Sequence, residues 1–454
     1  MFYPCNLKKI DQQKIWENQR NYTLSYDGFA LYIHVPFCYS ICNYCPFSRY
    51  KWSHSAEKTY INSIKKEMAL YSELPFIENS KILTIHIGGG TPTSLSVSSL
   101  NELMDSIKEN FNVAKNIQIA IEASPLIDIE KLSKMREMGI NRISFGVQSF
   151  QDGFLEILGT SHRSRHATNC VKWARDVGFE NVSIDLLYRL PGQNIDHWEE
   201  DLEYAINIEP DHLSLYSLIL CDRTPLIEFV KSGKIKDLPG VEADIEFDRW
   251  AYQKLREYGY ERITLNDYSL NGKKSIYAEI CWKAPQGEYL GLGPGAFEYI
   301  NDYYTCKVNN LRDYVDNITK KATIPYKFGT FVSEYERMHR FFVFGFKYLA
   351  VNLNKFEQEF GISADSIFEE TIKRLIRYKL IEERDSKLVL TDKGILYSNT
   401  VMKAFFSPEQ LQLCDYENSF KFQIINRAGE FSQFYLNTQK KMSNHHESKI
   451  IQRR

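Results

Sequence analysis

Short apolar runs of strand length alternate with amphipathic stretches of helical period along the first half of the chain. The strand-like runs cover residues 31–35, 82–87, 117–121, 142–147, 182–187 and 212–218. The helical stretches between them include residues 58–74, 98–111, 128–140 and 165–179. Because the apolar runs are nearly continuous, they indicate a parallel sheet that is buried on both faces. The fold class is therefore α/β, as a full or partial (β/α) barrel or an open doubly wound sheet, with the chemistry at the carboxyl ends of the strands.

The pattern becomes mainly helical from about residue 330, which indicates a separate C-terminal domain. We expect a leader at 1–28, a core at 29–265, a segment that completes the barrel at 266–329, a helical domain at 330–406 and a polar tail at 407–454. The helical domain resembles a winged helix with a small hairpin around 387–406. It lacks a concentrated basic face, so we expect a structural or lid role rather than DNA binding.

Composition and charge narrow the range of partners. The chain has 454 residues and a formal net charge of −2, which favours neither nucleic acid nor an anionic membrane. It shows no secretory signal and no apolar run of transmembrane length. The odd number of cysteines, nine, argues against a disulfide framework and for metal chemistry in a reducing compartment. We expect a cytoplasmic monomer that acts on a small molecule.

Three cysteines form a cluster on the loop that follows the first predicted strand. Cys38, Cys42 and Cys45 have C-x3-C-x2-C spacing. Structural zinc usually takes four ligands in two separated pairs, although His34 or His54 could complete such a site here. Three thiolates suit a cubane iron–sulfur cluster in which one iron keeps an open position. A non-protein ligand could therefore bind at that iron.

This loop resembles that of the radical S-adenosylmethionine (SAM) superfamily, and the chain from about residue 30 to about 405 resembles its oxygen-independent coproporphyrinogen III oxidase-like branch. The resemblance implies a partial (β/α)6 barrel of the TIM type. It implies a [4Fe-4S] cluster on Cys38, Cys42 and Cys45, and SAM bound at the open iron. Reductive cleavage of SAM would then give a 5′-deoxyadenosyl radical, with the electron from a partner such as flavodoxin or ferredoxin.

Further motifs stand at the ends of successive predicted strands. Taken alone, the glycines favour a turn, and the strand-end carboxylates could equally cap the following helices. The resemblance implies that Gly89, Gly90 and Thr91 hold the methionine end of SAM, and that Glu122, Gln148 and Asp185 contact SAM. It also implies that Tyr32 and Tyr44 flank the cluster, and that the backbone of Gly291, Gly293 and Gly295 lines the same cavity.

Three departures from the branch limit how far its function carries over. Pro46 follows Cys45 where the oxidases place a further cysteine shortly afterwards. Thr160 stands where the branch has an arginine that helps to bind a second SAM, with Arg163 nearby. The segment before LGLGPGA lacks the histidine of the heme chaperones, although Cys281 could replace it. We therefore expect methyl or methylene transfer (methylation or cyclopropanation) from a second SAM to a small molecule; the alternatives are a heme-binding chaperone and a tetrapyrrole-modifying enzyme.

Overall fold

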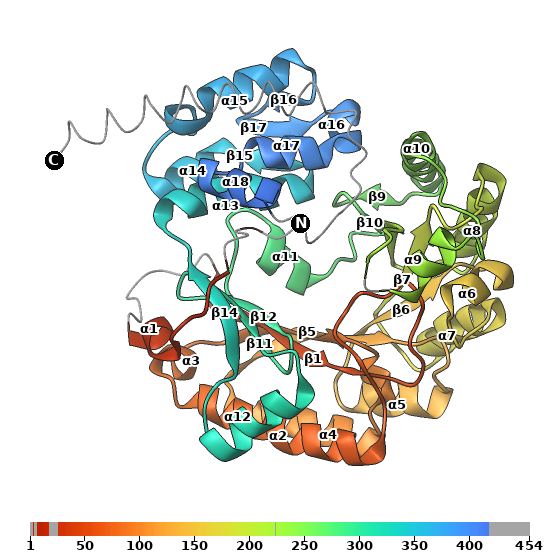
Figure 1. Cartoon of the computed structure of the whole chain (residues 1–454), viewed down its shortest axis with the longest axis vertical. Helices are drawn as coiled ribbons and strands as arrows, with labels where there is room; N and C mark the ends of the chain where they lie inside the picture. The colour runs from red at the N-terminus through yellow and green to blue at the C-terminus, as the bar shows by residue number, and fades with distance from the viewer. Residues whose placement is uncertain (1–2, 4–6, 18–25, 223, 417–454) are drawn as a thin grey trace.

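A computed structural model describes residues 3, 7–17, 26–222 and 224–416. Its central feature is a run of six neighbouring strands, each parallel to the next. These strands are β1 (Phe29–Val35), β4 (Ile82–Gly89), β5 (Val113–Ala123), β6 (Arg142–Gln148), β7 (Asn181–Tyr188) and β8 (His212–Ser217). The run curves so that one face becomes concave and the helices cover the other (Figure 1). The predicted α/β class with a parallel sheet is confirmed.

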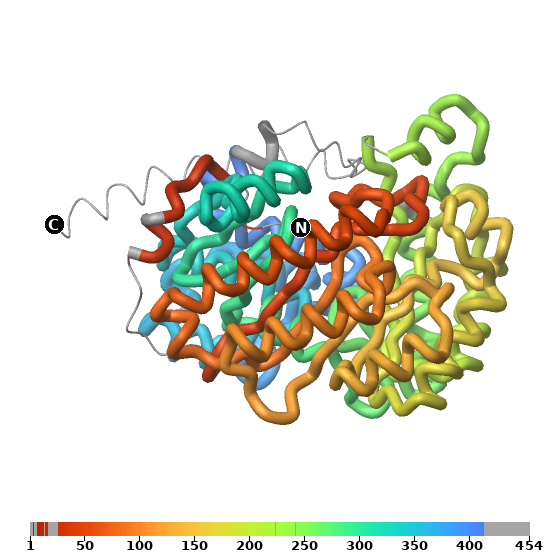
Figure 2. Tube along the Cα trace, turned by 90° about the horizontal axis from the view of Figure 1, so that it is seen from below, coloured from red at the N-terminus to blue at the C-terminus, as the bar shows by residue number. Residues whose placement is uncertain are grey.

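The helices of this core cover the convex face of the sheet. They are α2 (His54–Ser72), α3 (Pro75–Glu78), α4 (Val97–Asn110), α5 (Ile129–Glu137), α6 (Asp152–Leu158), α7 (Ser164–Asp176), α8 (Ile195–Asn207), α10 (Val241–Glu257) and α12 (Leu311–Lys321). The short helix α9 (Pro225–Lys231) instead packs near the carboxyl ends of β7 and β8. Polar residues start several of them: the side chains of Ser53, Ser96 and Asp128 each accept a hydrogen bond from a backbone N–H in the first turn. Figure 2 shows the first of these helices, in red and orange, running along the outside of the molecule.

Additional strands extend the sheet at both edges. β11 (Tyr289–Leu292) runs parallel to β1 and is followed by antiparallel β12 (Phe297–Ile300), β13 (Tyr303–Lys307) and β14 (Tyr326–Phe331). At the other edge β10 (Asp267–Ser269) pairs antiparallel with β8, and β9 (Glu261–Arg262) pairs antiparallel with β10. Within the described residues β9 and β14 do not pair with each other, so the barrel is partial. Segment 266–329 thus extends both edges without closing them.

The C-terminal domain combines helices with a three-stranded sheet in the order β15-β17-β16. Its elements are α13 (Glu334–Gly345), β15 (Ala350–Asn352), α14 (Leu353–Phe360), α15 (Asp365–Arg377), β16 (Ile381–Arg384), β17 (Lys387–Leu390), α16 (Asp392–Leu396), α17 (Ser398–Ala404) and α18 (Pro408–Tyr416). The hairpin is formed by β16 and β17, earlier than predicted, and most of 387–406 is helical. The physical reason is Thr391, whose hydroxyl accepts a hydrogen bond from the Gly394 N–H and starts α16.

At both ends of the described residues, more of the chain packs on the two domains than the sequence pattern predicted. Tyr3 is buried in the core of the C-terminal domain, and Lys8 forms an isolated antiparallel bridge with Gly329. α1 (Gln12–Glu17) contributes Ile15 to the main core. At the other end α18 continues beyond residue 406, and residues 417–454 of the predicted tail lie outside the described residues. In the described part, no helix has the length and apolar character needed to cross a bilayer.

Candidate functional site

The cysteine loop leaves β1 and is held at both of its ends. Cys38 lies in β2 (Phe37–Cys38), which pairs in parallel with β3 (Tyr50–Lys51) after the loop. Between them, the Asn43 N–H donates to the Leu158 carbonyl at 2.8 Å, and the Leu226 N–H donates to the Asn43 carbonyl at 3.0 Å. These contacts tie the middle of the loop to the segments that follow β6 and β8.

The three thiols lie close enough to influence one another. Burial raises the pKa of Cys42 to about 12, and repulsion from the Cys45 and Cys38 thiolates adds to that shift. Burial also raises the pKa of Cys38, whereas the Thr91 hydroxyl donates to its Sγ at 3.4 Å and opposes the shift. Grouped thiols of this kind lose their protons when metal binds, because the metal charge replaces the proton.

The donor set fits a cluster better than a single zinc ion. In the described part of the chain, no three His, Cys, Asp or Glu side chains are arranged to hold one metal ion. His34 is engaged elsewhere: its Nδ1 lies 3.1 Å from the Tyr32 hydroxyl and its Nε2 lies 3.3 Å from the Ser48 carbonyl. In a [4Fe-4S] cluster each thiolate binds a different iron, so the sulfurs are spaced more widely than around one ion. Cys38, Cys42 and Cys45 would hold three of the irons.

The glycines at the end of β4 allow the backbone that follows β4 to pack closely against the end of β1 and the start of the cysteine loop. The Gly90 N–H donates to the Val35 carbonyl at 2.8 Å, and the Thr91 N–H donates to the Phe37 carbonyl at 2.7 Å. A Cβ on Gly90 would lie 2.7 Å from the Phe37 carbonyl oxygen and 3.1 Å from the Cys38 Sγ. Gly90 and Thr91 therefore seat the cysteine loop through their N–H groups; a contact with SAM stays a prediction for them and for Gly89.

Glu122 closes β5 and connects the glycine segment with an aromatic stack. Its carboxylate accepts a hydrogen bond from the Gly89 N–H at 3.0 Å and lies 3.0 Å from the His86 Nε2. The His86 ring stacks on Tyr277 with centroids 4.8 Å apart, and Tyr32 stacks beside both rings. Tyr277 belongs to α11 (Ile276–Trp282). The Glu122 side chain remains 38% exposed, so it can also contact a ligand.

Asp185 and Gln148 reach the site from β7 and β6. Asp185 accepts a hydrogen bond from the Ser144 hydroxyl at 3.1 Å, and burial followed by repulsion from Glu122 raises its pKa to about 7. Gln148 has φ of 69°, next to a register shift between β6 and β7. A non-glycine residue in this left-handed region is strained, and such strain is concentrated at functional sites. Tyr44 lies near the same groups, since burial and the charges of Cys42, Cys45 and Asp185 raise its pKa.

The glycines of LGLGPGA pack close to the backbone of β1 and to the cysteine loop. A Cβ on Gly293 would lie 2.4 Å from the His34 carbonyl oxygen, and φ at Gly293 is 96°. The Gly293 N–H donates to the buried Glu67 carboxylate at 2.8 Å, and the Gly291 carbonyl accepts from the buried Lys307 ammonium. Gly295 lies near Ser48 of the cysteine loop. None of these three glycines lines the cavity described next, and their role in cofactor binding stays a prediction.

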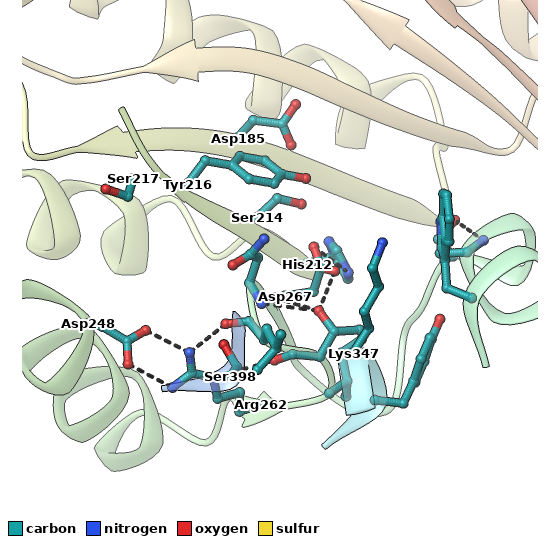
Figure 3. Close-up of a pocket in the computed structure, with 18 of the residues that line it drawn as sticks. Asp185, His212, Ser214, Tyr216, Ser217, Asp248, Arg262, Asp267, Lys347 and Ser398 are labelled. Atoms are coloured by element: carbon teal, nitrogen blue, oxygen red, sulfur yellow. Dashed lines mark hydrogen bonds and ion pairs between the residues drawn. The ribbon is translucent and has the colours of Figure 1, made fainter. Parts of the chain in front are cut away.

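A cavity of about 690 Å³ occupies the concave side of the sheet, beneath the C-terminal domain (Figure 3). Its floor is formed by alternate strand positions, which all point to one face. These floor residues are His86, Glu122, Arg142, Ser144, Asp185, His212, Ser214 and Tyr216, and Tyr188 borders the cavity at the end of β7. Its roof includes Tyr277 and Trp282 of α11, Lys347 and Tyr348 of η2 (Phe346–Tyr348), and Ile395, Leu396, Ser398, Asn399 and Met402. Sequence reasoning found Glu122 and Asp185 and missed the other polar members.

Arg163 and Cys281, which the sequence offered in place of the missing arginine and histidine of the branch, face away from the cavity. The Arg163 guanidinium donates to the Thr160 carbonyl at 3.3 Å and to the His162 carbonyl at 3.0 Å. Cys281 is fully buried in a cluster with Tyr289 and Tyr299, and burial raises its pKa well above the usual value for a thiol. Neither residue lines the cavity, so neither takes the place that the sequence suggested for it.

The chain is similar to known proteins in sequence. Residues 32–205 match the family model of the Radical SAM superfamily, and residues 332–397 match that of the HemN C-terminal domain. The heme chaperone HemW of Bacillus subtilis is 34% identical over 379 residues, which cover 83% of this chain and 98% of that protein. HemW of Lactococcus lactis is 30% identical over 378 residues, with 83% and 97% covered.

A solved structure shows the same fold. The coproporphyrinogen III oxidase HemN of Escherichia coli has a TM-score of 0.77 at 23% identity, covering 88% of this chain and 94% of that one. The family model of the C-terminal domain agrees with the same branch. The chain therefore belongs to the radical SAM superfamily, in the branch that contains HemN and HemW.

Proposed function

We propose that the chain is a heme-binding radical SAM protein of the chaperone type. The observation that carries the proposal is the similarity to HemW heme chaperones over almost their entire length. The relatives reported above do not support the methyl transfer predicted from sequence, and Arg163 bonds to backbone carbonyls instead of lining the cavity.

The residues at the strand ends provide the binding site for the cofactors. When bound, the [4Fe-4S] cluster supplies an electron that can cleave SAM, and a flavodoxin or ferredoxin would reload it. In this proposal Glu122 and Asp185 receive the ammonium and ribose hydroxyls of SAM. Gln148 contacts SAM from β6, and the roof formed by the C-terminal domain keeps water away from them.

The cavity suits a second, flat ligand. Its volume of about 690 Å³ lies within the range of about 300–1,000 Å³ for small-molecule sites. The rings of Tyr216, Tyr277 and Trp282 line it and offer apolar faces for a macrocycle. His86 and His212 also line it, and imidazole is a common axial ligand of heme iron.

Anaerobic reconstitution tests the proposal. The chain is loaded with iron and sulfide, and then titrated with hemin while the Soret band is followed. We expect saturable binding of one heme per chain, transfer of that heme to an apo-hemoprotein, and no methylated product or S-adenosylhomocysteine with SAM and dithionite. Formation of S-adenosylhomocysteine without any heme uptake would overturn the proposal in favour of methyl transfer.

The variant Cys42→Ala tests the cluster ligands independently of heme binding. This variant should lose the visible absorbance of the cluster, because a cubane with two thiolates has two incompletely ligated irons. Heme uptake should persist, because Cys42 does not line the cavity. Retained cluster iron and colour would contradict the ligand assignment and leave the heme proposal standing.

A further inference from the structure

Four cations line the cavity, and they divide into two kinds. Arg262 forms a salt bridge with Asp248 at 2.6 Å, and Lys274 forms one with Glu279 at 3.0 Å. Arg142 and Lys347 form no salt bridge with any carboxylate among the described residues. Two cations at the cavity wall therefore retain unused hydrogen-bonding capacity.

Arg142 stands at the start of β6 on the floor of the cavity. Its side chain is buried, with the residue only 4% exposed, and its Nε has no hydrogen-bond partner. Burial lowers its pKa, and the negative charges of Asp185 and Asp267 oppose that shift. Both acids are satisfied by nearer donors, since the Ser144 hydroxyl donates to Asp185 at 3.1 Å and the Thr264 hydroxyl donates to Asp267 at 2.6 Å. A buried guanidinium without a close anion is costly unless a ligand supplies one.

Lys347 reaches the same cavity from the roof. Its ammonium lies 4.0 Å from the Trp282 ring centroid and 4.8 Å from that of Phe344, and Figure 3 shows it pointing from the C-terminal domain toward the strands. Burial, followed by repulsion from Arg340, lowers its pKa to about 8, and the negative charge of Asp267 opposes that shift without forming a salt bridge. The aromatic rings orient the ammonium but do not neutralise its charge, so an anion between floor and roof would be stabilised by both cations.

SAM does not account for this pair of cations. In the arrangement proposed above its carboxylate binds at the cluster and its ammonium at Glu122 or Asp185. Arg142 pairs in register with Asn181, four positions before Asp185 on β7. At about 3.3 Å per residue, the backbone of Arg142 lies about 13 Å from the level of Asp185. Because the Arg142 backbone lies this far from the strand-end residues assigned to SAM, we assign the anion at this subsite to a different molecule.

We infer that Arg142 and Lys347 form a carboxylate-binding subsite, and that its occupant is the propionate edge of a tetrapyrrole. The inference rests on the proposed function and deepens it. Heme carries two propionates on one edge, and the cavity offers two cations without a salt bridge, together with the aromatic rings that line it and could contact the macrocycle. Bidentate contact with Arg142 would fix the orientation of the ring.

A comparison of hemin with hemin dimethyl ester tests the subsite, because esterification removes both carboxylate charges and leaves the macrocycle. The wild-type chain should bind hemin about 10- to 100-fold more tightly than the ester, as expected for hydrogen bonds to charged groups. Lys347→Met and Arg142→Gln should lose most of this preference by binding hemin more weakly. Lys347→Arg should retain it, and so should Lys274→Met, which removes a cavity cation already paired with Glu279. Circular dichroism checks that each variant is folded.

The outcomes separate the two proposals. An equal affinity of the wild-type chain for hemin and its ester, or an unchanged preference in both variants, would overturn the subsite and leave heme binding intact. If the wild-type chain binds neither compound, the proposed function fails, and titration with SAM decides the subsite. If Lys347→Met and Arg142→Gln each bind one SAM fewer than the wild-type chain, the carboxylate subsite stands with SAM as its occupant. If both variants bind as much SAM as the wild-type chain, the subsite is overturned.

Discussion

Gly90→Ala is expected to displace the cysteine loop. The new Cβ would lie 2.7 Å from the Phe37 carbonyl oxygen and 3.1 Å from the Cys38 Sγ. The carbonyl would have to retreat by about 0.5 Å to restore ordinary contact. That same oxygen accepts hydrogen bonds from the Thr91 N–H at 2.7 Å and the Ser94 hydroxyl at 3.3 Å. Overpacking costs about 1–3 kcal/mol and weakening two hydrogen bonds about 1 kcal/mol each, so we expect a loss of about 3–5 kcal/mol.

Two measurements check this expectation. Urea unfolding of the apo chain gives the free-energy change, and iron per chain after anaerobic reconstitution shows whether the loop still holds the cluster. Gly153→Ala is the matched control, because a Cβ there meets no atom within 4 Å and the residue lies in α6, where alanine should stabilise by about 0.5–1 kcal/mol. The reasoning is refuted if Gly90→Ala matches wild type in both unfolding midpoint and iron content.

Three other changes have defined outcomes. Burial raises the pKa of Asp185 to about 7, so its contribution to stability is complete below pH of about 4 and is lost as pH rises through about 7. Asp185→Asn should therefore gain stability relative to wild type at pH 8 compared with pH 5 in urea titrations; parallel pH curves would contradict this. Gly293→Ala should lower the free energy of unfolding by several kcal/mol, and Gly361→Ala by only about 1 kcal/mol. Both glycines have positive φ, but only at Gly293 would the new Cβ meet backbone, 2.4 Å from the His34 carbonyl oxygen. Equal urea midpoints for the two variants would refute the clash. Glu122→Gln keeps an acceptor for the Gly89 N–H but loses its charge, so calorimetry should show SAM binding weakened about tenfold with little change in stability, and an unchanged affinity would exclude a charge contact.

The strands were predictable because each is a short apolar run between amphipathic helices. The runs at 142–147 and 182–187 correspond to β6 and β7 within one residue at each end. The position of the hairpin in the C-terminal domain was harder to predict, because KLVLTDKGIL contains both a strand and the start of a helix. The Thr391 cap decides where the strand ends and the helix begins. The strands that extend the sheet edges were not predicted individually, because their pairing depends on neighbours distant in sequence.

The cysteine loop was visible from spacing, but the cavity was not. His86 stands inside an apolar strand and Arg142 at the start of one, and a polar residue there indicates an inward-facing group only when the curvature of the sheet is known. Lys347 lies more than 200 residues further along the chain than Arg142, and only docking of the C-terminal domain brings both to one cavity. The glycines of LGLGPGA illustrate the opposite case, where a motif was evident but its neighbours Glu67 and Lys307 were not.

The burial of Tyr3 in the C-terminal domain has a consequence for biosynthesis. Its hydroxyl donates to Glu336, 333 positions along the chain, and accepts from the Ser407 N–H at 3.3 Å, while its ring packs on Phe406. At about 5–20 residues per second, a ribosome needs about 20–70 s to add the residues between Tyr3 and Glu336. Tyr3 is thus synthesised early, but its side chain can pack into the C-terminal domain only late in translation. The roof of the cavity acquires its complete core only after translation has passed Ser407, so nascent chains spend most of their synthesis with the floor of the cavity uncovered.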